Sequence, residues 1–347
     1  MRKRELCAAA LAAALLTGCT GGGGENGTTT RTASPGQATA AAGLEDAYTR
    51  IVAAALPSVV QINTDQGEGS GVVYDADGHI VTNAHVVAGA RTFQVVPSSG
   101  GNPLNARLVG SFNAGDLAVV KVDGANLPPA TFGDSAQLKV GQIVLAMGSP
   151  LGLSGSVTNG IVSATGRTVT GRRQGSFPGA TISDAVQTNA AINPGNSGGA
   201  LVTLNNEVVG IPTLAAGTGE GSPAPGIGFA IPSNTVRTIA PQLISSGKVT
   251  SSGRAALNVT IAQTFNITTG EPGGVAVVSV AEGGAADAAD LRKGDVITEV
   301  NGRATPTTTA LAEVLAGLNV GQTVPVKIRR DGAEQTVQVK LGELPGG

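Results

Sequence analysis

The sequence predicts a mainly β protein, with an all-β barrel or sandwich followed by a second, smaller domain. Short runs of β-branched residues alternate with Asp-Gly and Gly-rich turns, as in antiparallel strands joined by tight connections. The chain has 52 glycines and no tryptophan, which suits such turns better than a helical bundle. Its 347 residues are enough for two domains.

The composition is that of a globular protein and excludes some classes of partner. Apolar residues make up 41% of the chain and charged residues 13%, which indicates a folded core. The formal net charge is −2, and no basic run or aromatic-interleaved patch follows the first few residues. A nucleic acid is therefore not an expected partner.

The N-terminus has the pattern of a secretory signal peptide over residues 1–18. A basic start precedes an Ala/Leu-rich run at residues 6–16, shorter than the roughly 20 residues that a membrane span needs. Residues 16–19 (Leu-Thr-Gly-Cys) resemble the lipobox of bacterial lipoproteins. This resemblance implies lipidation at Cys19 and an extracytoplasmic protein anchored to the bacterial cell membrane, in the cell envelope or periplasm. The alternatives are an unlipidated secreted protein and an uncleaved anchor.

A tether and a short helix are expected next. Residues 19–43 lack a hydrophobic period, which predicts a flexible low-complexity tether. Helical spacing then relates Leu44, Tyr48, Ile51, Val52 and Ala55. Pro57 should end this helix, and strands are predicted at residues 58–62, 69–74, 80–81 and 93–96.

Ser197 is the candidate nucleophile. It lies in the run Asn-Pro-Gly-Asn-Ser-Gly-Gly at residues 193–199, just before an apolar strand. A serine hydroxyl needs a base and nearby oxyanion donors, and the flexible glycines would let the main-chain N–H groups of Gly195 and Ser197 converge as such donors. A serine among glycines is by itself more often an ordinary loop.

His85 is the candidate base and Asp116 its candidate partner. His79 follows an Asp-Gly turn and should be exposed, whereas His85 lies in the apolar run at residues 81–87. Asp116 opens an apolar strand, so its carboxylate should be partly buried and need a hydrogen bond, which an imidazole N–H would supply. A buried histidine without a role and a strand-capping aspartate are the simpler interpretations.

The order His85, Asp116, Ser197 is that of the chymotrypsin-type triad. Residues 82–87, 116–119 and 195–199 resemble the three signature segments of the HtrA (Deg) family of serine proteases. Residues 148–152, 157–163 and 226–232 resemble further segments of that family. The resemblance covers roughly residues 44–248, taken here as the protease domain.

The resemblance implies a chymotrypsin-like double six-stranded β-barrel with the triad in the cleft between barrels. His85 would accept the proton of Ser197, Asp116 would orient the imidazole, and no metal or cofactor is implied. The implied protein is an endopeptidase that cleaves misfolded or damaged envelope proteins, and its relatives assemble as trimers. The alternative is a chaperone-like or peptide-sensing binding protein with minor or conditional proteolysis.

The substrate preference follows from a position in the family pattern. In chymotrypsin-like enzymes the residue six before the serine floors the primary pocket, and here this residue is Ala191, followed by Ile192. Neither is acidic, so cleavage after Arg or Lys is not expected. The expected walls are Ile227, Phe229, Ala230 and Ile231. A shallow apolar pocket and cleavage after Val, Ala, Ile or Leu are predicted, with weak discrimination between them.

The second domain is expected at residues 255–343. Residues 284–302 resemble the helix-then-strand core of a PDZ domain, and the run at residues 311–318 would be its second helix. PDZ domains bind C-terminal peptides by adding a strand and holding the carboxylate on backbone N–H groups. The expected carboxylate loop is Ala256, Leu257, Asn258 and Val259. Relatives usually have glycine at the position of Asn258, but asparagine tolerates left-handed geometry. The alternative is a PDZ-shaped domain that binds no peptide.

Overall fold

The computed structural model of the chain describes residues 35–124, 126–149, 155–171, 175–177, 179–193, 195–217, 223–265 and 270–345. The signal peptide expected at residues 1–18 and the lipidation site expected at Cys19 lie outside the described residues. None of the helices in the described ranges has the length and apolar character needed to cross a membrane.

The first helix, α1 (Pro35–Ala55), is longer than the sequence predicts. Its C-terminal half packs as expected, because Ile51 and Ala55 are buried in a hydrophobic core. A 3-10 turn (Leu56–Ser58) that contains Pro57 follows it. The prediction of a tether is wrong for residues 35–43, which are helical. Alanine has the highest helix propensity and proline suits the first helical position, so this Ala-rich stretch extends the helix.

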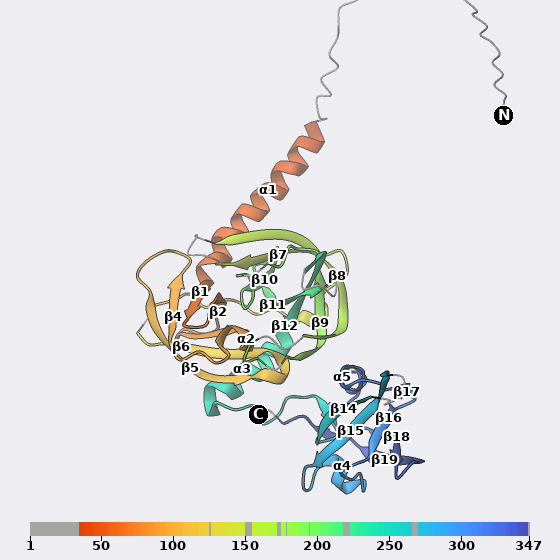
Figure 1. The fold of residues 1–347 in the computed structure, drawn as a ribbon. Helices are drawn as coiled ribbons and strands as arrows, with labels where there is room; N and C mark the ends of the chain where they lie inside the picture. The colour runs from red at the N-terminus through yellow and green to blue at the C-terminus, as the bar shows by residue number, and fades with distance from the viewer. Residues whose placement is uncertain are drawn as a thin grey trace, which may run out of the picture. The chain divides into compact units, whose positions relative to one another are not determined.

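Two closed six-stranded barrels lie side by side after α1, which confirms the predicted double-barrel fold (Figure 1). The first barrel has the strand order β1-β2-β3-β6-β5-β4. Its strands are β1 (Val59–Thr64), β2 (Glu68–Val73), β3 (His79–Thr82), β4 (Phe93–Pro97), β5 (Leu104–Phe112) and β6 (Leu117–Val122). Two short helical segments interrupt it, namely α2 (Ala84–Val87) and the 3-10 helix η2 (Asn113–Gly115).

The second barrel repeats this arrangement with the order β10-β11-β12-β9-β8-β7. The 3-10 helix η3 (Ser135–Gln137) lies in the connection between the barrels. The strands of the second barrel are β7 (Ile143–Gly148), β8 (Ser156–Thr170), β9 (Thr181–Thr188), β10 (Ala200–Thr203), β11 (Val208–Gly217) and β12 (Pro223–Pro232). Helix α3 (Ser233–Ser246) follows β12 and ends at Gly247, whose φ of 70° is left-handed.

Three hydrophobic clusters hold the barrels. One lies in the first barrel, includes Ile62 and Val120, and also takes in Phe177 and Ala180 from the connection between β8 and β9. Another lies within the second barrel and includes Val144 and Leu201. The third joins residues of both barrels, α1 and α3 into one core that includes Val72, Val119, Met147, Ile211 and Leu243. Because burial of apolar side chains is the main favourable term in folding, this shared core fixes the barrels against each other.

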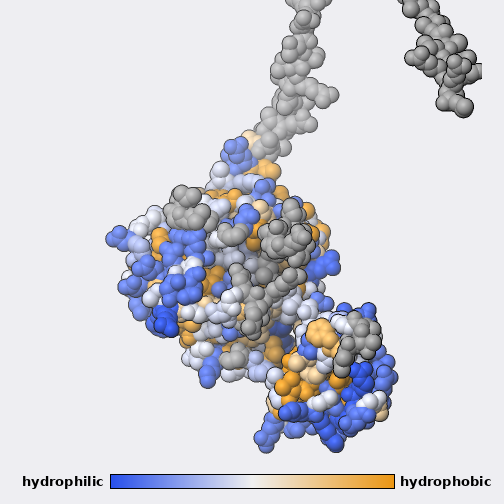
Figure 2. Space-filling view, viewed as in Figure 1, coloured by the Kyte–Doolittle hydropathy of each residue, from blue (hydrophilic) through white to orange (hydrophobic). Residues whose placement is uncertain are grey.

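The C-terminal region is a small α+β unit with its own hydrophobic core. Its main sheet has the order β14-β15-β16-β18-β19, with β17 beside β16, and β13 pairs with β20. Its elements are β13 (Ala255–Ala256), β14 (Val259–Phe265), β15 (Pro272–Val280), α4 (Ala285–Ala288), β16 (Val296–Val300), β17 (Arg303–Ala304), α5 (Thr308–Ala316), β18 (Thr323–Arg330), β19 (Ala333–Lys340) and β20 (Gly342–Glu343). Apolar side chains gather on its surface over β14 and β15 (Figure 2).

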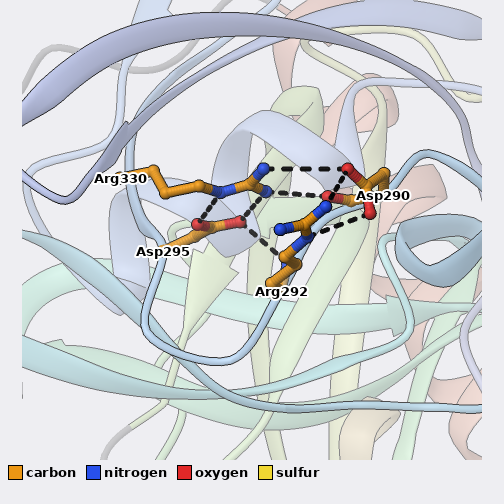
Figure 3. Close-up of polar contacts among 4 residues, drawn as sticks. All are labelled: Asp290, Arg292, Asp295 and Arg330. Carbon is orange, nitrogen blue, oxygen red and sulfur yellow. Dashed lines mark hydrogen bonds and ion pairs between the residues drawn. The ribbon is translucent and has the colours of Figure 1, made fainter.

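An ion-pair cluster ties the turn after α4 to β18 (Figure 3). The Arg330 guanidinium donates to both carboxylate oxygens of Asp295, at 2.7 and 2.8 Å. The main-chain N–H of Arg292 donates to Asp295 at 2.8 Å, and the Arg292 side chain pairs with Asp290. These bonds hold the pKa of Asp295 below its ordinary value, chiefly through the bond from Arg330. Asp295 is only 1% exposed, so the pair replaces the water that its carboxylate loses.

Candidate active site

His85 and Asp116 are brought together by two neighbouring segments of the first barrel. Helix α2 carries His85, and η2 places Asp116 just before β6. His85 Nδ1 lies 2.9 Å from Oδ2 and 3.0 Å from Oδ1 of Asp116, and the main-chain N–H of His85 donates to Oδ1 at 3.0 Å. The Asp116 side chain is 1% exposed. The buried carboxylate is therefore held in place by contacts with both the ring and the main chain of His85.

Two further side chains fix Asp116, and sequence reasoning assigned neither of them a role. Asn83 Nδ2 donates to the main-chain oxygen of Asp116 at 3.1 Å. Thr213 Oγ1, on β11 of the second barrel, donates to Asp116 Oδ2. Asn83 lies inside a matched segment, residues 82–87, and so was within reach of motif reasoning. No local pattern marks Thr213, because it meets Asp116 only after the barrels pack together.

Phe177 is a third neighbour that the sequence did not single out. Its ring lies 5.9 Å from the imidazole of His85, measured between centroids, at an interplanar angle of 59°. Phe177 is itself buried. This tilted contact gives one side of His85 an apolar cover, which limits the approach of water from that direction.

His79 does not join this group. Its Nδ1 lies 2.7 Å from Asp75 Oδ2, and its side chain is 12% exposed, so the prediction that it is exposed is wrong. The turn between β2 and β3 folds Asp75 back onto it. Asp75, Asp77 and His79 are the group of described side chains that could hold a metal, with candidate ligand atoms within 4.8 Å of one another. The ammonium of Lys121, bonded to the main-chain oxygen of Asp77, makes the turn less favourable for a cation.

Ser197 lies in a tight turn of the second barrel, called here the glycine-serine turn (residues 195–198). Its hydroxyl donates to the main-chain oxygen of Thr213 at 3.4 Å. Between the described atoms of Ser197 and His85 there is no hydrogen bond. The main-chain N–H groups of Gly195 and Ser197 find no acceptor within the described ranges, whereas that of Gly198 donates to Pro212 at 3.0 Å. Two N–H groups of the turn are therefore available to a ligand.

Gly198 is required by close contact with the first barrel. Its φ is 83°, in the left-handed region. A Cβ at this position would lie 2.2 Å from the main-chain oxygen of Ser70 and 2.4 Å from Thr82 Oγ1. Any side chain here would push the turn away from the first barrel.

The predicted pocket residues fall into two groups. Ala191 is exposed, and its main-chain oxygen accepts from Thr158 Oγ1 at 2.9 Å. Ile227 is 39% exposed and Phe229 is half-buried. Ala230 and Ile231 are fully buried, one inside the second barrel and one in the shared core. Ala230 and Ile231 therefore cannot line an accessible substrate pocket, because their side chains are buried in the hydrophobic cores.

Ile192 is buried and packs across Gly228. A Cβ at Gly228 would lie 2.5 Å from Ile192 Cγ1, so the glycine leaves the space that the isoleucine fills. Ile192 therefore belongs to the packed core of the second barrel.

The expected carboxylate loop borders a groove in the C-terminal region. The groove has a volume of about 380 Å³, and all four loop residues line it together with apolar residues of β14 and α5, including Ile261, Leu311 and Leu315. Asn258 has a φ of 58°, so the predicted left-handed geometry is confirmed. Its side chain accepts from the N–H of Ala285 at 3.3 Å and donates to Glu343 O at 2.8 Å.

Comparison with known proteins assigns a family to each of the two domains. A family model of the trypsin-like peptidase domain matches residues 69–211, and a model of the PDZ domain matches residues 248–341. The serine protease PepD of Mycobacterium tuberculosis is 40% identical over 313 residues, which cover 85% of this chain and 66% of PepD. A probable periplasmic serine endoprotease, DegP-like, of Pseudomonas putida is 39% identical over 284 residues, covering 81% of this chain and 57% of that protein.

A relative closer in length and two solved structures agree with this assignment. The serine protease Do-like HtrA of Lactococcus lactis is 40% identical over 294 residues, or 80% of this chain and 71% of that protein. A serine endoprotease structure from Yersinia pestis has a TM-score of 0.57 and 34% identity, covering 86% of this chain and 98% of its own. The HtrA-type protease AlgW with a decapeptide has a TM-score of 0.58 and 31% identity, covering 86% and 99%.

The chain spans 57% and 66% of the Pseudomonas and Mycobacterium relatives that it matches. Its two matched domains follow each other in the order that its sequence motifs predict. The chain belongs to the HtrA family of serine proteases, with a trypsin-like peptidase domain followed by a PDZ domain.

Proposed function

We propose that this chain is a serine endopeptidase in which Ser197 is the nucleophile, His85 the general base and Asp116 the residue that orients the base. The observation that carries the proposal is the contact of His85 Nδ1 with both oxygens of the Asp116 carboxylate, at 3.0 and 2.9 Å. An ionised carboxylate can only accept, so Nδ1 carries the proton and Nε2 is left free to accept another.

The reaction would follow the acyl-transfer sequence of such triads. Ser197 Oγ attacks the peptide carbonyl while its proton passes to His85 Nε2, and the buried Asp116 carboxylate stabilises the imidazolium. The N–H groups of Gly195 and Ser197, which find no acceptor among the described residues, donate to the oxyanion. The imidazolium then protonates the leaving amine, and His85 activates the water that hydrolyses the acyl-enzyme.

Ser197 must turn before it can react. Its hydroxyl donates to Thr213 in this structure, and transfer to His85 requires that it rotate away from that oxygen. This observation favours the second candidate function, a chaperone-like or peptide-sensing protein whose proteolysis is minor or conditional. The two candidates differ in whether the purified chain is active without an added ligand.

We propose unfolded or damaged envelope proteins as substrates, cut after small aliphatic residues. Ile192 fills the space beside Gly228, which supports a shallow pocket. A shallow apolar pocket discriminates weakly, since one methylene is worth about 1–3 kcal/mol. Ala191, Ile192, Ile227 and Phe229 remain the candidate pocket residues.

We propose that the PDZ domain binds C-terminal peptides or regulates the protease through them. Within the described strands, β14 pairs only with β15, so its other edge is open to an added strand beside the apolar groove. The AlgW structure with a decapeptide is a relative with a bound peptide. Fluorescence anisotropy with labelled peptides that end in an apolar residue, against the same peptides with an amidated C-terminus, tests this role.

We also propose an extracytoplasmic, lipid-anchored protein that forms a homotrimer. The lipobox-like sequence before Cys19 and the periplasmic designation of the Pseudomonas relative support the location. The trimer is carried over from the family resemblance. Membrane fractionation of Cys19→Ser against the unchanged chain tests the anchor, and light scattering of the purified protein tests the trimer.

Degradation of reduced casein tests the main proposal. The unchanged chain should cleave it and Ser197→Ala should not. If both are inert, C-terminal peptides are added to test conditional activation. Continued inactivity, with both proteins suppressing aggregation of an unfolded client, would replace the protease by the chaperone-like function.

A further inference from the structure

Ser70, in β2 of the first barrel, contacts the glycine-serine turn at two points. Its Oγ donates to the main-chain oxygen of Gly195 at 2.6 Å, and its main-chain N–H donates to the main-chain oxygen of Ser197 at 2.8 Å. The side chain is completely buried. One residue of the first barrel therefore holds the carbonyl groups of the two residues whose N–H groups would bind the oxyanion.

The direction of the Ser70 hydroxyl is fixed by a third bond. The main-chain N–H of Ser149 donates to Ser70 Oγ at 2.9 Å, so the oxygen accepts from one side. The hydroxyl hydrogen is then left for Gly195 O, the other partner of Oγ. Both neighbours of this hydroxyl are main-chain groups, which cannot change rotamer.

The backbone of Ser70 is anchored as well. Its main-chain oxygen accepts from Thr82 Oγ1 at 2.7 Å, and β2 pairs with both β1 and β3. The close approach to Gly198, whose Cβ would lie 2.2 Å from that oxygen, leaves little freedom for the turn to shift. Ser70 thus sits on a rigid strand and not on a loop, as an accurate site requires.

We propose that Ser70 is a positioning residue that holds the glycine-serine turn in the shape needed to stabilise an oxyanion. The inference rests on the proposed serine protease function. Ser70 does not touch the substrate. It fixes the peptide plane that follows Gly195 and the carbonyl of Ser197. Without its hydroxyl, the carbonyl of that plane loses its bond to the first barrel, while the N–H of Asn196 in the same plane keeps its bond to the main-chain oxygen of Asn193 at 3.0 Å. A donor displaced by a fraction of an ångström binds the transition state less well while leaving substrate binding almost unchanged.

The test compares Ser70→Ala with Ser98→Ala in the full chain. Ser98 is also a buried serine of the first barrel, and its hydroxyl donates to the main-chain oxygen of Val59, on the strand β1. With a chromogenic peptide amide, Ser70→Ala should lower kcat by about 10- to 100-fold with KM changed less than about threefold. A peptide boronic acid, whose tetrahedral adduct places an oxygen at the oxyanion position, should lose affinity by a similar factor. Ser98→Ala should change neither quantity.

Ser70→Thr keeps the hydroxyl and should recover most of the lost kcat. Thermal unfolding shows whether Ser70→Ala is folded. If Ser70→Ala does not fold, Ser70→Cys replaces it in the test and is compared with Ser70→Thr. The cysteine replaces the hydroxyl by a weak donor, so Ser70→Cys should lower kcat while leaving KM nearly unchanged. An unchanged kcat, a loss that appears only in KM, or an equal loss in Ser98→Ala would overturn the role of Ser70. If the unchanged chain neither cleaves the amide nor binds the boronic acid, the proposed protease function itself fails, and the inference with it.

Discussion

The Thr213 hydroxyl donates a hydrogen bond to the carboxylate of Asp116, across the boundary between the two barrels. The same residue accepts the hydroxyl of Ser197 on its main-chain oxygen. Thr213 therefore contacts both the acid and the nucleophile of the candidate triad, and it is buried at 4% exposure. Its two contacts use different parts of the residue, so a substitution can remove one and keep the other.

Thr213→Val removes the hydroxyl and keeps the shape and the main-chain oxygen. A hydrogen bond to a charged group is worth about 1.5–3 kcal/mol, so kcat for a peptide amide should fall by roughly 10- to 100-fold. Steady-state kinetics at several pH values measure this. Thr213→Ser, which retains the donor, should stay within a few-fold of the unchanged chain. Equal rates for Val and Ser at this position would show that the bond does not matter for turnover.

Asp295→Asn should destabilise the PDZ domain in a pH-dependent way. The pKa of Asp295 is lowered in the folded chain, chiefly by the bond from Arg330, from an ordinary value near 3.8. A lowered folded pKa gives stabilisation that is complete above the ordinary value and is lost as the pH falls through the folded pKa. In the variant, the free energy of unfolding should be lower by roughly 2–3 kcal/mol at neutral pH. On acidification, the free energy of unfolding should fall less in the variant than in the unchanged chain.

Hydrogen exchange of β16 and β18 in the full chain measures this difference. Lys327→Gln is the matched control, because Lys327 pairs with Glu299 across the same two strands at 50% and 28% exposure. An exposed pair contributes about 0–1 kcal/mol, so this variant should change little. Equal effects of the two substitutions would contradict the importance of the buried pair.

Ile192→Ala should deepen the primary pocket. The isoleucine packs across Gly228, and its truncation leaves space for a larger side chain of the substrate. Cleavage after Leu or Phe should rise relative to cleavage after Ala by about tenfold, within the 1–3 kcal/mol typical of one methylene. A peptide-library cleavage profile measures the ratio. Val209→Ala, which truncates another residue of the same core, should leave the profile unchanged.

Asn258→Ala should destabilise the PDZ domain more than Asn258→Gly. The φ of 58° costs an alanine roughly 1–2 kcal/mol, whereas glycine adopts it readily. Both variants lose the side-chain bonds to Ala285 and Glu343, so the difference between them isolates the backbone strain. Chemical denaturation of the two variants measures this difference. An alanine variant as stable as the glycine variant would remove the backbone argument for asparagine at this position.

Sequence patterns predicted the parts of the fold that depend on local composition. Alternating β-branched runs gave the strands, and the motifs around His85, Asp116 and Ser197 pointed to the two-barrel architecture. The start of α1 is hard to predict, because the alanines at residues 38 and 40–42 lie in a low-complexity stretch without a hydrophobic period, although alanine has the highest helix propensity. The Asp-Gly turn before His79 predicts an exposed side chain. The contact with Asp75 that partly buries it depends on how the turn folds back, which the sequence does not show.

The site was less predictable wherever a contact crosses between distant segments. Ser70 lies 125 residues from Gly195, and Thr213 lies 97 residues from Asp116. No spacing rule links such pairs, which meet only through packing of the barrels. Ala230 and Ile231 illustrate the opposite error, since a motif placed them near the pocket while strand geometry turned them into the cores.

The division of the candidate triad between the barrels has a consequence for how the protein matures. His85 and Asp116 belong to the first barrel, whereas Ser197 and the turn around it belong to the second. A chain in which only the first half has folded holds a base without a nucleophile, and the second half alone lacks the base. In the proposed protease, chemistry that requires all three residues would begin only when the shared core has formed, so an unfinished chain would be protected from digesting itself and its neighbours.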